Sequence, residues 1–182
     1  MEKGNMSLTM IDPGHGGNDP GAVANGLKEK ELNLLIAAGL YSLLQKAQLE
    51  ARLTRADDRL VSLKARCEMA NNLKAGLFIS IHCNASTEAG AKGIEVFHSP
   101  GSEAGQSLAG SIYDALAALG RQMRGVKAEG FYVLRHTLMP ACLVECGFIT
   151  NPEEALWLKT HTSESAQALA QGIINHIKRE AL

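Results

Sequence analysis

The apolar residues of the chain alternate between strand-length runs and stretches with helical spacing, and this alternation limits the folds that it can adopt. The segment LFISIH at 77–82 is an apolar run of strand length, whereas Leu32, Ile36, Leu40 and Leu44 recur at helical spacing. Strands that alternate with helices indicate an α/β domain in which helices pack on both faces of one sheet. In such folds the chemistry gathers at the strand ends and in the loops that leave them.

The pattern predicts six strands and five helices. Strands are expected at 8–11, 51–54, 77–82, 93–97, 131–134 and 141–145. Helices are expected at about 30–48, after Ser62 as N-cap, around 108–119, from Asn151-Pro152 onward, and around 166–177. We find no internal repeat and no linker-like segment, so we expect a single domain over 1–182 with an ordered core at about 8–180 and no additional binding domain.

The overall composition excludes several classes of protein. The net charge is −1, so nothing suggests long-range attraction to nucleic acid or to an anionic membrane. No apolar run has the length of a membrane span, and the polar start of the chain does not resemble a signal peptide. We expect a monomer, because no self-complementary apolar face is evident. The cysteines Cys67, Cys83, Cys142 and Cys146 form no C-x-x-C pair, and we interpret them as free thiols.

Polar residues with metal-binding chemistry stand at the ends of the predicted strands. His15 lies in IDPGHGGNDPG after the first strand, His82 follows LFISI, and Glu145 lies within the apolar strand ACLVECGF. Glu29 stands at the start of the first long helix. Strands that run in the same direction end at one edge of a sheet, so these residues are expected to converge there although they are far apart in the sequence.

Two histidines and a carboxylate are a common ligand set for catalytic zinc. A further glutamate can then act as general base on the water that zinc activates, whose pKa falls to about 7. The residues alone do not decide which glutamate has which role. Each also has an ordinary explanation: a lone histidine after a strand is more often structural, and Glu29 suits the first turn of a helix. Glu145 is harder to explain in this way, because an unpaired charge in an apolar strand is costly.

Motifs for other kinds of chemistry are absent. The loop after the first strand has Asp19 where a dinucleotide fingerprint requires its last glycine. The sequence contains no phosphate-binding P-loop, no G-x-S-x-G nucleophile elbow and no H-E-x-x-H zinc motif. The glycines beside His15 are better explained as allowing the backbone to turn tightly around a metal or a bulky substrate.

Four segments together resemble the catalytic domain of the zinc-dependent N-acetylmuramoyl-L-alanine amidases, a family that includes bacterial cell-wall amidases and phage lysins. The segments are IDPGHGGNDPGAVANGLKEKELNL, TRADDRLVSLKARCEMANNLKAGLFISIHCNAS, GIEVFHS and FYVLRHTLMPACLVECGFITNPEEALWL. The resemblance covers nearly the whole chain from about Leu8. It implies a mixed sheet of about six strands flanked by helices, of the phosphorylase/hydrolase-like class.

The resemblance also implies roles for individual residues. His15, Glu29 and His82 take the positions of the family's zinc ligands, for one Zn²⁺ per chain, and Glu145 takes that of its catalytic glutamate. The implied reaction is hydrolysis of the amide between N-acetylmuramic acid and L-alanine in peptidoglycan, so the implied partners are peptidoglycan and muramyl peptides, and the site of action is the cell wall. An export route is not evident from the sequence.

Other residues of the motif regions are assigned lesser roles. Asn84, Arg135 and His136 are expected in loops beside the motifs, where they are candidates for substrate contact. Asp12 is expected to orient His15 or to cap the turn. Segment 99–122 holds one ordinary amphipathic helix and no inserted inhibitory helix, so we expect an open site.

Two cysteines depart from the family pattern. Cys83 and Cys146 directly follow His82 and Glu145, and neighbours on a strand point to opposite faces, so both thiols are expected to face away from the zinc.

The ligand set alone would equally suit a zinc peptidase that cuts within the stem peptide. A non-catalytic regulator that binds peptidoglycan is a further alternative, but such a protein should have lost a ligand or the catalytic glutamate.

Overall fold

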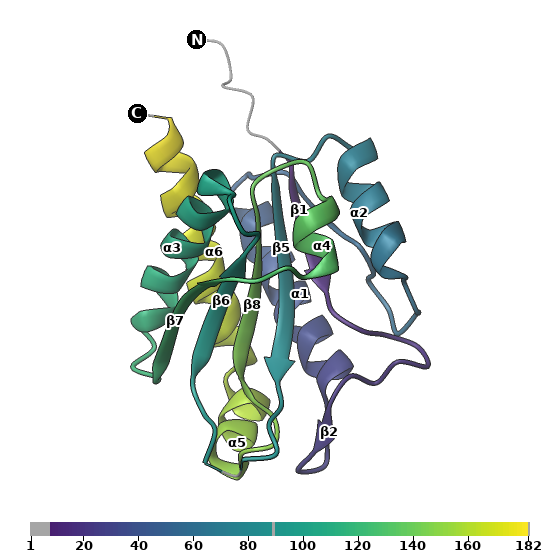
Figure 1. Ribbon diagram of the computed structural model, residues 1–182, viewed down its shortest axis with the longest axis vertical. Helices are drawn as coiled ribbons and strands as arrows, with labels where there is room; N and C mark the ends of the chain where they lie inside the picture. Colours follow the sequence, from purple (N-terminus) through teal and green to yellow (C-terminus); the bar gives the residue numbers. More distant parts are fainter. Residues whose placement is uncertain (1–7, 89, 182) are drawn as a thin grey trace.

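A six-stranded sheet forms the centre of the fold, in the order β4-β1-β5-β8-β6-β7 (Figure 1). The computed structural model describes residues 8–88 and 90–181. The strands of the sheet are β1 (Thr9–Pro13), β4 (Ala51–Leu53), β5 (Leu77–Asn84), β6 (Ile94–His98), β7 (Met123–Ala128) and β8 (Ala141–Phe148). The short strands β2 (Val23–Ala24) and β3 (Leu27–Lys28) form a separate antiparallel hairpin.

The strand directions make this a mixed sheet. β4, β1, β5 and β8 all run parallel to one another. β6 and β7 are parallel to each other, and β6 pairs with β8 in the antiparallel direction. The carboxyl ends of β1, β5 and β8 therefore lie at the same edge, which is where the sequence predicts the site. The prediction of an α/β fold with one mixed sheet of about six strands is confirmed.

Helices cover both faces of the sheet. One face carries α1 (Glu29–Lys46), α3 (Glu103–Ala117) and α6 (Thr162–Glu180), which also pack on one another. The other face carries α2 (Leu63–Asn72) and α4 (Tyr132–His136), while α5 (Pro152–Thr160) follows β8. In β5, Ile79 and Ile81 belong to the apolar core under α1, α3 and α6, whereas Phe78 belongs to the core under α2 and α4. No helix in the described part of the chain is long and apolar enough to cross a membrane.

Two predicted helix starts are confirmed in detail. The Ser62 hydroxyl accepts a hydrogen bond from the backbone N–H of Ala65 at 3.2 Å, as expected of an N-cap at α2. The Asn151 side-chain oxygen accepts from the N–H groups of Glu153 and Glu154, and Pro152 occupies the first turn of α5. Both caps satisfy N–H groups that a helix leaves without partners.

One predicted strand is wrong, and three observed strands were not predicted: the short strands β2 and β3 of the hairpin, and β7 of the central sheet. Residues 131–134 do not form a strand: Phe131 caps α4, and only Val133 and Leu134 of this apolar run are buried. A short apolar run cannot be assigned to strand or helix by periodicity, and here it forms a single helical turn. The sixth strand is β7, whose sequence MRGVKA is partly exposed at the sheet edge and lacks apolar alternation.

Candidate metal centre

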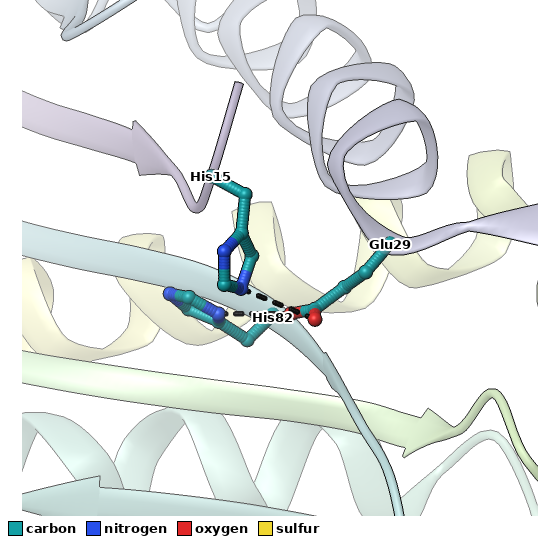
Figure 2. Close-up of side chains that lie close together, drawn as sticks. All are labelled: His15, Glu29 and His82. Carbon is teal, nitrogen blue, oxygen red and sulfur yellow. Dashed lines mark hydrogen bonds and ion pairs between the residues drawn. The ribbon is translucent and has the colours of Figure 1, made fainter. Parts of the chain in front are cut away.

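The structure brings His15, Glu29 and His82 together from three separate elements (Figure 2). His15 lies just after β1, Glu29 is the first residue of α1, and His82 lies near the end of β5. One side-chain nitrogen or oxygen from each residue lies within 4.8 Å of the other two. This is a compact set of two imidazoles and one carboxylate.

The Glu29 carboxylate lies between the two histidine rings. Its Oε2 is 3.1 Å from His15 Nε2, and its Oε1 is 2.9 Å from His82 Nδ1. Backbone N–H groups of Ala22 and Cys83 also donate to it, at 2.9 and 3.1 Å. Burial opposes ionisation of Glu29, but the hydrogen bonds with His15 and His82 outweigh burial and lower its pKa below the usual value. The carboxylate is therefore ionised at neutral pH.

Asp19 holds the other nitrogen of the His15 ring. Asp19 Oδ2 lies 2.8 Å from His15 Nδ1, and Asp19 Oδ1 accepts from the backbone N–H of Gly21 at 3.1 Å. Burial would lower the pKa of His15, but the hydrogen bonds and charges of Glu29 and Asp19 raise it above the usual value. A carboxylate on the distal nitrogen is the usual way to fix the ring of a metal-binding histidine. Sequence reasoning missed this role; the signal was an aspartate four residues after His15 in the same glycine-rich loop.

Two glycines are required because the backbone approaches the ligand side chains closely. A Cβ atom at Gly14 would lie 2.2 Å from His82 Cε1, far closer than van der Waals contact with the imidazole ring allows. A Cβ atom at Gly21, where φ is +64°, would lie 2.5 Å from Glu29 Oε2. The glycines were expected to let the backbone turn tightly around a metal or a bulky substrate; at these two positions it is the His82 and Glu29 side chains that leave no room for a Cβ atom.

Arg66 fixes the loop that carries His15. Its Nη1 donates to Asp12 Oδ1 at 2.6 Å, and its Nη2 donates to the His15 carbonyl at 2.7 Å. Asp12 also accepts from the hydroxyls of Thr54 and Ser80 at 2.6 and 2.8 Å. Asp12 was expected to orient His15; these contacts reach the His15 backbone through Arg66, and the ring is held by Asp19. The fixed carbonyl supports the positive φ of 61° at His15, which is uncommon for a residue with a side chain.

Glu145 lies beside the three clustered residues. It is the register partner of His82 on the adjacent parallel strand, so both side chains are on the same face of the sheet. Its Oε2 is buried and has no hydrogen-bond partner within the described residues. Burial, and then the negative charges of Glu29 and Glu95, raise the pKa of Glu145 well above the usual value. The pKa values of the two glutamates in the site are therefore shifted in opposite directions, that of Glu29 downward and that of Glu145 upward.

These residues line a cleft of about 460 Å³. One part of its wall is polar and includes the three clustered residues and Glu145. Another part is apolar and comes from the segment before α2 and from α4: Leu60, Val61, Leu63, Phe131 and Tyr132. The cleft is thus large enough for a small substrate and differs in chemistry from one side to the other.

The three candidates for substrate contact lie at different distances from this cleft. Asn84 lines it and donates from Nδ2 to Glu95 Oε2 at 2.8 Å. The expectation that all three lie in loops is wrong: Asn84 ends β5, and Arg135 and His136 belong to α4 and are not among the residues that line the cleft. The His136 ring stacks on Tyr132, which does line it, with 3.9 Å between the ring centroids. A substrate role for each of the three stays a prediction.

The comparison with known families decides the assignment. Residues 9–179 match the family described as N-acetylmuramoyl-L-alanine amidase. The chain belongs to this family.

Relatives of this amidase-family chain include bacterial and phage proteins. The chain is 40% identical over 173 residues to the N-acetylmuramoyl-L-alanine amidase LytC of Bacillus subtilis (strain 168). This match covers 92% of the chain but only 35% of LytC. The chain is 40% identical to the endolysin of Bacillus phage SPP1, over 91% of the chain and 64% of the endolysin. The chain therefore spans between about a third and two thirds of the length of these two relatives.

The solved structures agree with the fold. The catalytic domain of the amidase CwlV from Bacillus (Paenibacillus) polymyxa var. colistinus superposes with a TM-score of 0.90 at 36% identity. The match covers 95% of this chain and 99% of the CwlV domain. The described sheet and helices therefore correspond to nearly the whole of the CwlV catalytic domain.

The cysteines of this family member lie away from the candidate metal centre. Cys83 and Cys146 are buried in the apolar core under α1, α3 and α6, on the opposite side of the sheet from His82 and Glu145. Burial raises the pKa of Cys83 and Cys146 well above the usual value, so both remain protonated thiols at neutral pH. Their position agrees with the prediction that they face away from the ligand set. All four cysteines are free thiols, as predicted.

Proposed function

We propose that this chain hydrolyses the amide bond between N-acetylmuramic acid and L-alanine in bacterial peptidoglycan, and that it uses one zinc ion to do so. The observation that carries this proposal is the placement of His15, Glu29 and His82 in one cleft with Glu145, whose Oε2 has no hydrogen-bond partner among the described residues. Similarity to LytC and to the CwlV catalytic domain supports the choice of bond.

The residues present fit a zinc ion. His15, Glu29 and His82 would hold it, because two imidazoles and a carboxylate are a ligand set that catalytic zinc takes in proteins. Both oxygens of Glu29 already face the histidine rings, and Asp19 holds the ring of His15 from the other side. When bound, zinc would act as a Lewis acid that acidifies water and polarises a carbonyl group.

Glu145 would move the proton in this reaction. We assign it as the general base that takes a proton from the attacking water and then delivers that proton to the leaving nitrogen of L-alanine. Its buried Oε2 has no competing hydrogen bond within the described residues, so it is free to accept one from water. The raised pKa of Glu145 favours uptake and retention of the proton between these two transfers.

The remaining assignments concern the substrate and its setting. We place Asn84 against the substrate, because it lines the cleft next to Glu145, and we place Arg135 and His136 behind Tyr132 as weaker contacts. The substrate class is peptidoglycan and its muramyl peptides, so the site of action is the bacterial cell wall. We propose that the domain acts as a monomer.

The test is mass spectrometry of the products formed from a muramyl peptide, with and without a zinc chelator. The proposal predicts free N-acetylmuramic acid and a peptide that begins with L-alanine, both lost on chelation and restored by added zinc. Cleavage within the peptide would identify a zinc peptidase instead. Zinc binding with no cleavage of any muramyl peptide would indicate a binding protein and would contradict the proposal.

A further inference from the structure

The sheet face that carries His82 and Glu145 continues over β6 and β7, away from the covering helices. Glu95 on β6 is the register partner of Glu145, and Lys127 on β7 is the register partner of Phe97, two residues after Glu95. Because partners in register share a face, Glu95 and Lys127 lie on the same side of the sheet as Glu145. In Figure 1, α2 and α4 lie toward β1 and β5, and not over β6 and β7.

Two cations on β7 share one carboxylate at this position. Arg124 Nε and Lys127 Nζ both donate to Glu95 Oε1, at 2.8 and 2.5 Å. Burial opposes ionisation of Glu95, but the two cations outweigh it and lower its pKa. The group of three therefore carries one excess positive charge, and the Arg124 and Lys127 side chains are 35% and 44% exposed. We call Arg124 and Lys127 the β7 cations.

The β7 cations are linked to the cleft through Asn84. Asn84 lines the cleft and donates to Glu95 Oε2, the oxygen that the β7 cations leave free. Arg66 also lines the cleft, but its side chain is only 2% exposed and its guanidinium is engaged by Asp12 and by backbone carbonyls. The β7 cations, by contrast, are partly exposed and are joined through Glu95 to a residue that lines the cleft.

The apolar part of the cleft wall, near α2 and α4, has a different character. Leu60 and Leu63 are 60% and 55% exposed, and Tyr132 is 40% exposed. An apolar and aromatic wall suits an uncharged N-acetylated sugar ring, whereas a cationic wall suits an anion. In a muramyl peptide the sugar is neutral and the peptide carries the free carboxylates, so charge complementarity places the two parts on opposite sides of the scissile amide.

We propose that the β7 cations, Arg124 and Lys127, bind a carboxylate of the peptide part of the substrate. This subsite rests on the proposed amidase function and makes it more specific: the enzyme should prefer muramyl peptides with free carboxylates over their carboxamide forms. A charge-assisted hydrogen bond to an exposed guanidinium or ammonium group supplies that preference.

The test compares two muramyl peptides, one with free carboxylates and one in which every carboxylate is a carboxamide. With the zinc-loaded protein we expect kcat/KM to be about tenfold higher for the carboxylate form. Lys127→Met and Arg124→Met should each reduce this ratio several-fold, mainly through KM, and should still cleave the carboxamide form. Lys127→Arg should keep the ratio. Lys178→Met, an exposed cation on α6 under the opposite face, is the charge-matched control and should change nothing.

Cleavage of the carboxamide substrate distinguishes a failure of the proposed subsite from a failure of the proposed amidase function. Equal kcat/KM for the two substrates with the unaltered protein would overturn the subsite and leave the amidase function standing. The subsite would also be overturned if the ratio survived both methionine substitutions. Failure of the unaltered, zinc-loaded protein to cleave either substrate would contradict the amidase function and the subsite with it.

Discussion

Glu145 and His82 are register partners on the adjacent parallel strands β8 and β5, so their side chains lie on one face of the sheet. His82 belongs to the three-residue cluster, and Glu145 lies beside it in the same cleft without being one of its members. In the function proposed above, the two neighbouring positions have different tasks: His82 holds the metal and Glu145 moves the proton.

Replacing Glu145 should therefore remove activity and spare metal binding. For Glu145→Gln we expect kcat to fall by roughly 10²–10⁴, the usual contribution of a general base. Zinc affinity, measured by competition with a coloured chelator, should change by no more than a few-fold. A variant that still turned over substrate at the original rate would remove Glu145 from the mechanism, and loss of zinc would make it a ligand.

Asp19 should strengthen zinc binding through its contact with His15 Nδ1. Asp19→Asn keeps the shape of the side chain but removes its charge, so we expect zinc affinity to fall by roughly 10–100-fold. The same competition titration measures this change. Asp114→Asn, on the exposed side of α3, is the matched control and should bind zinc as the unaltered protein does. Equal affinities for the two variants would show that Asp19 does not orient His15.

Gly14 should tolerate no side chain, because a Cβ atom there would overlap the His82 ring at 2.2 Å. We expect Gly14→Ala to displace the ring and to weaken zinc binding by more than the roughly 10–100-fold that follows loss of a group orienting a ligand. Gly110→Ala is the control, since nothing lies within 4 Å of a Cβ atom at that position on α3. Unchanged zinc affinity in Gly14→Ala would mean that the loop and His82 pack differently.

The raised pKa of Glu145 makes a prediction for the stability of the metal-free protein. A carboxyl whose pKa is raised in the folded state contributes stability that is fully present below its unfolded pKa, about 4.3, and is lost as pH rises through the folded pKa. The amide side chain introduced by Glu145→Gln does not titrate. The difference in Tm between this variant and the unaltered protein, both in a chelator, should therefore grow in favour of the variant as the pH rises above about 4.

The size of this effect follows from the shift in pKa. Each pKa unit between the folded and unfolded states corresponds to about 1.4 kcal/mol in the free energy of unfolding. A change of about 1 kcal/mol in that free energy changes Tm by roughly 2–4 °C for a domain of this size. Differential scanning calorimetry at several pH values measures the change. A Tm difference independent of pH would show that Glu145 ionises normally in the metal-free protein.

Much of the site was predictable because strand ends converge in an α/β sheet. His15, His82 and Glu145 follow or end apolar strands, and those strands run parallel, so their side chains meet at one edge. The residues alone did not divide the roles of Glu29 and Glu145. That division depends on contacts: Glu29 faces both histidine rings, and Glu145 has an oxygen without a partner within the described residues.

The parts that escaped prediction depend on tertiary contacts or lack a periodic signal. β7 is a partly exposed edge strand interrupted by Gly125, so it shows no alternation. The apolar run at 131–134 forms a helical turn in which only Val133 and Leu134 are buried. The contact of Asp19 with His15 and that of Arg66 with the His15 carbonyl require the folded loop. Such contacts leave no spacing rule in the sequence.

The most direct test of the whole account is a zinc titration of the metal-free protein, with release of the L-alanine-terminated peptide from a muramyl peptide as the readout. The account predicts that activity rises in proportion to added zinc and reaches its plateau at one zinc per chain, and that Glu29→Gln shows no such plateau. Full activity in the metal-free protein, or a plateau unaffected by the change at Glu29, would contradict it.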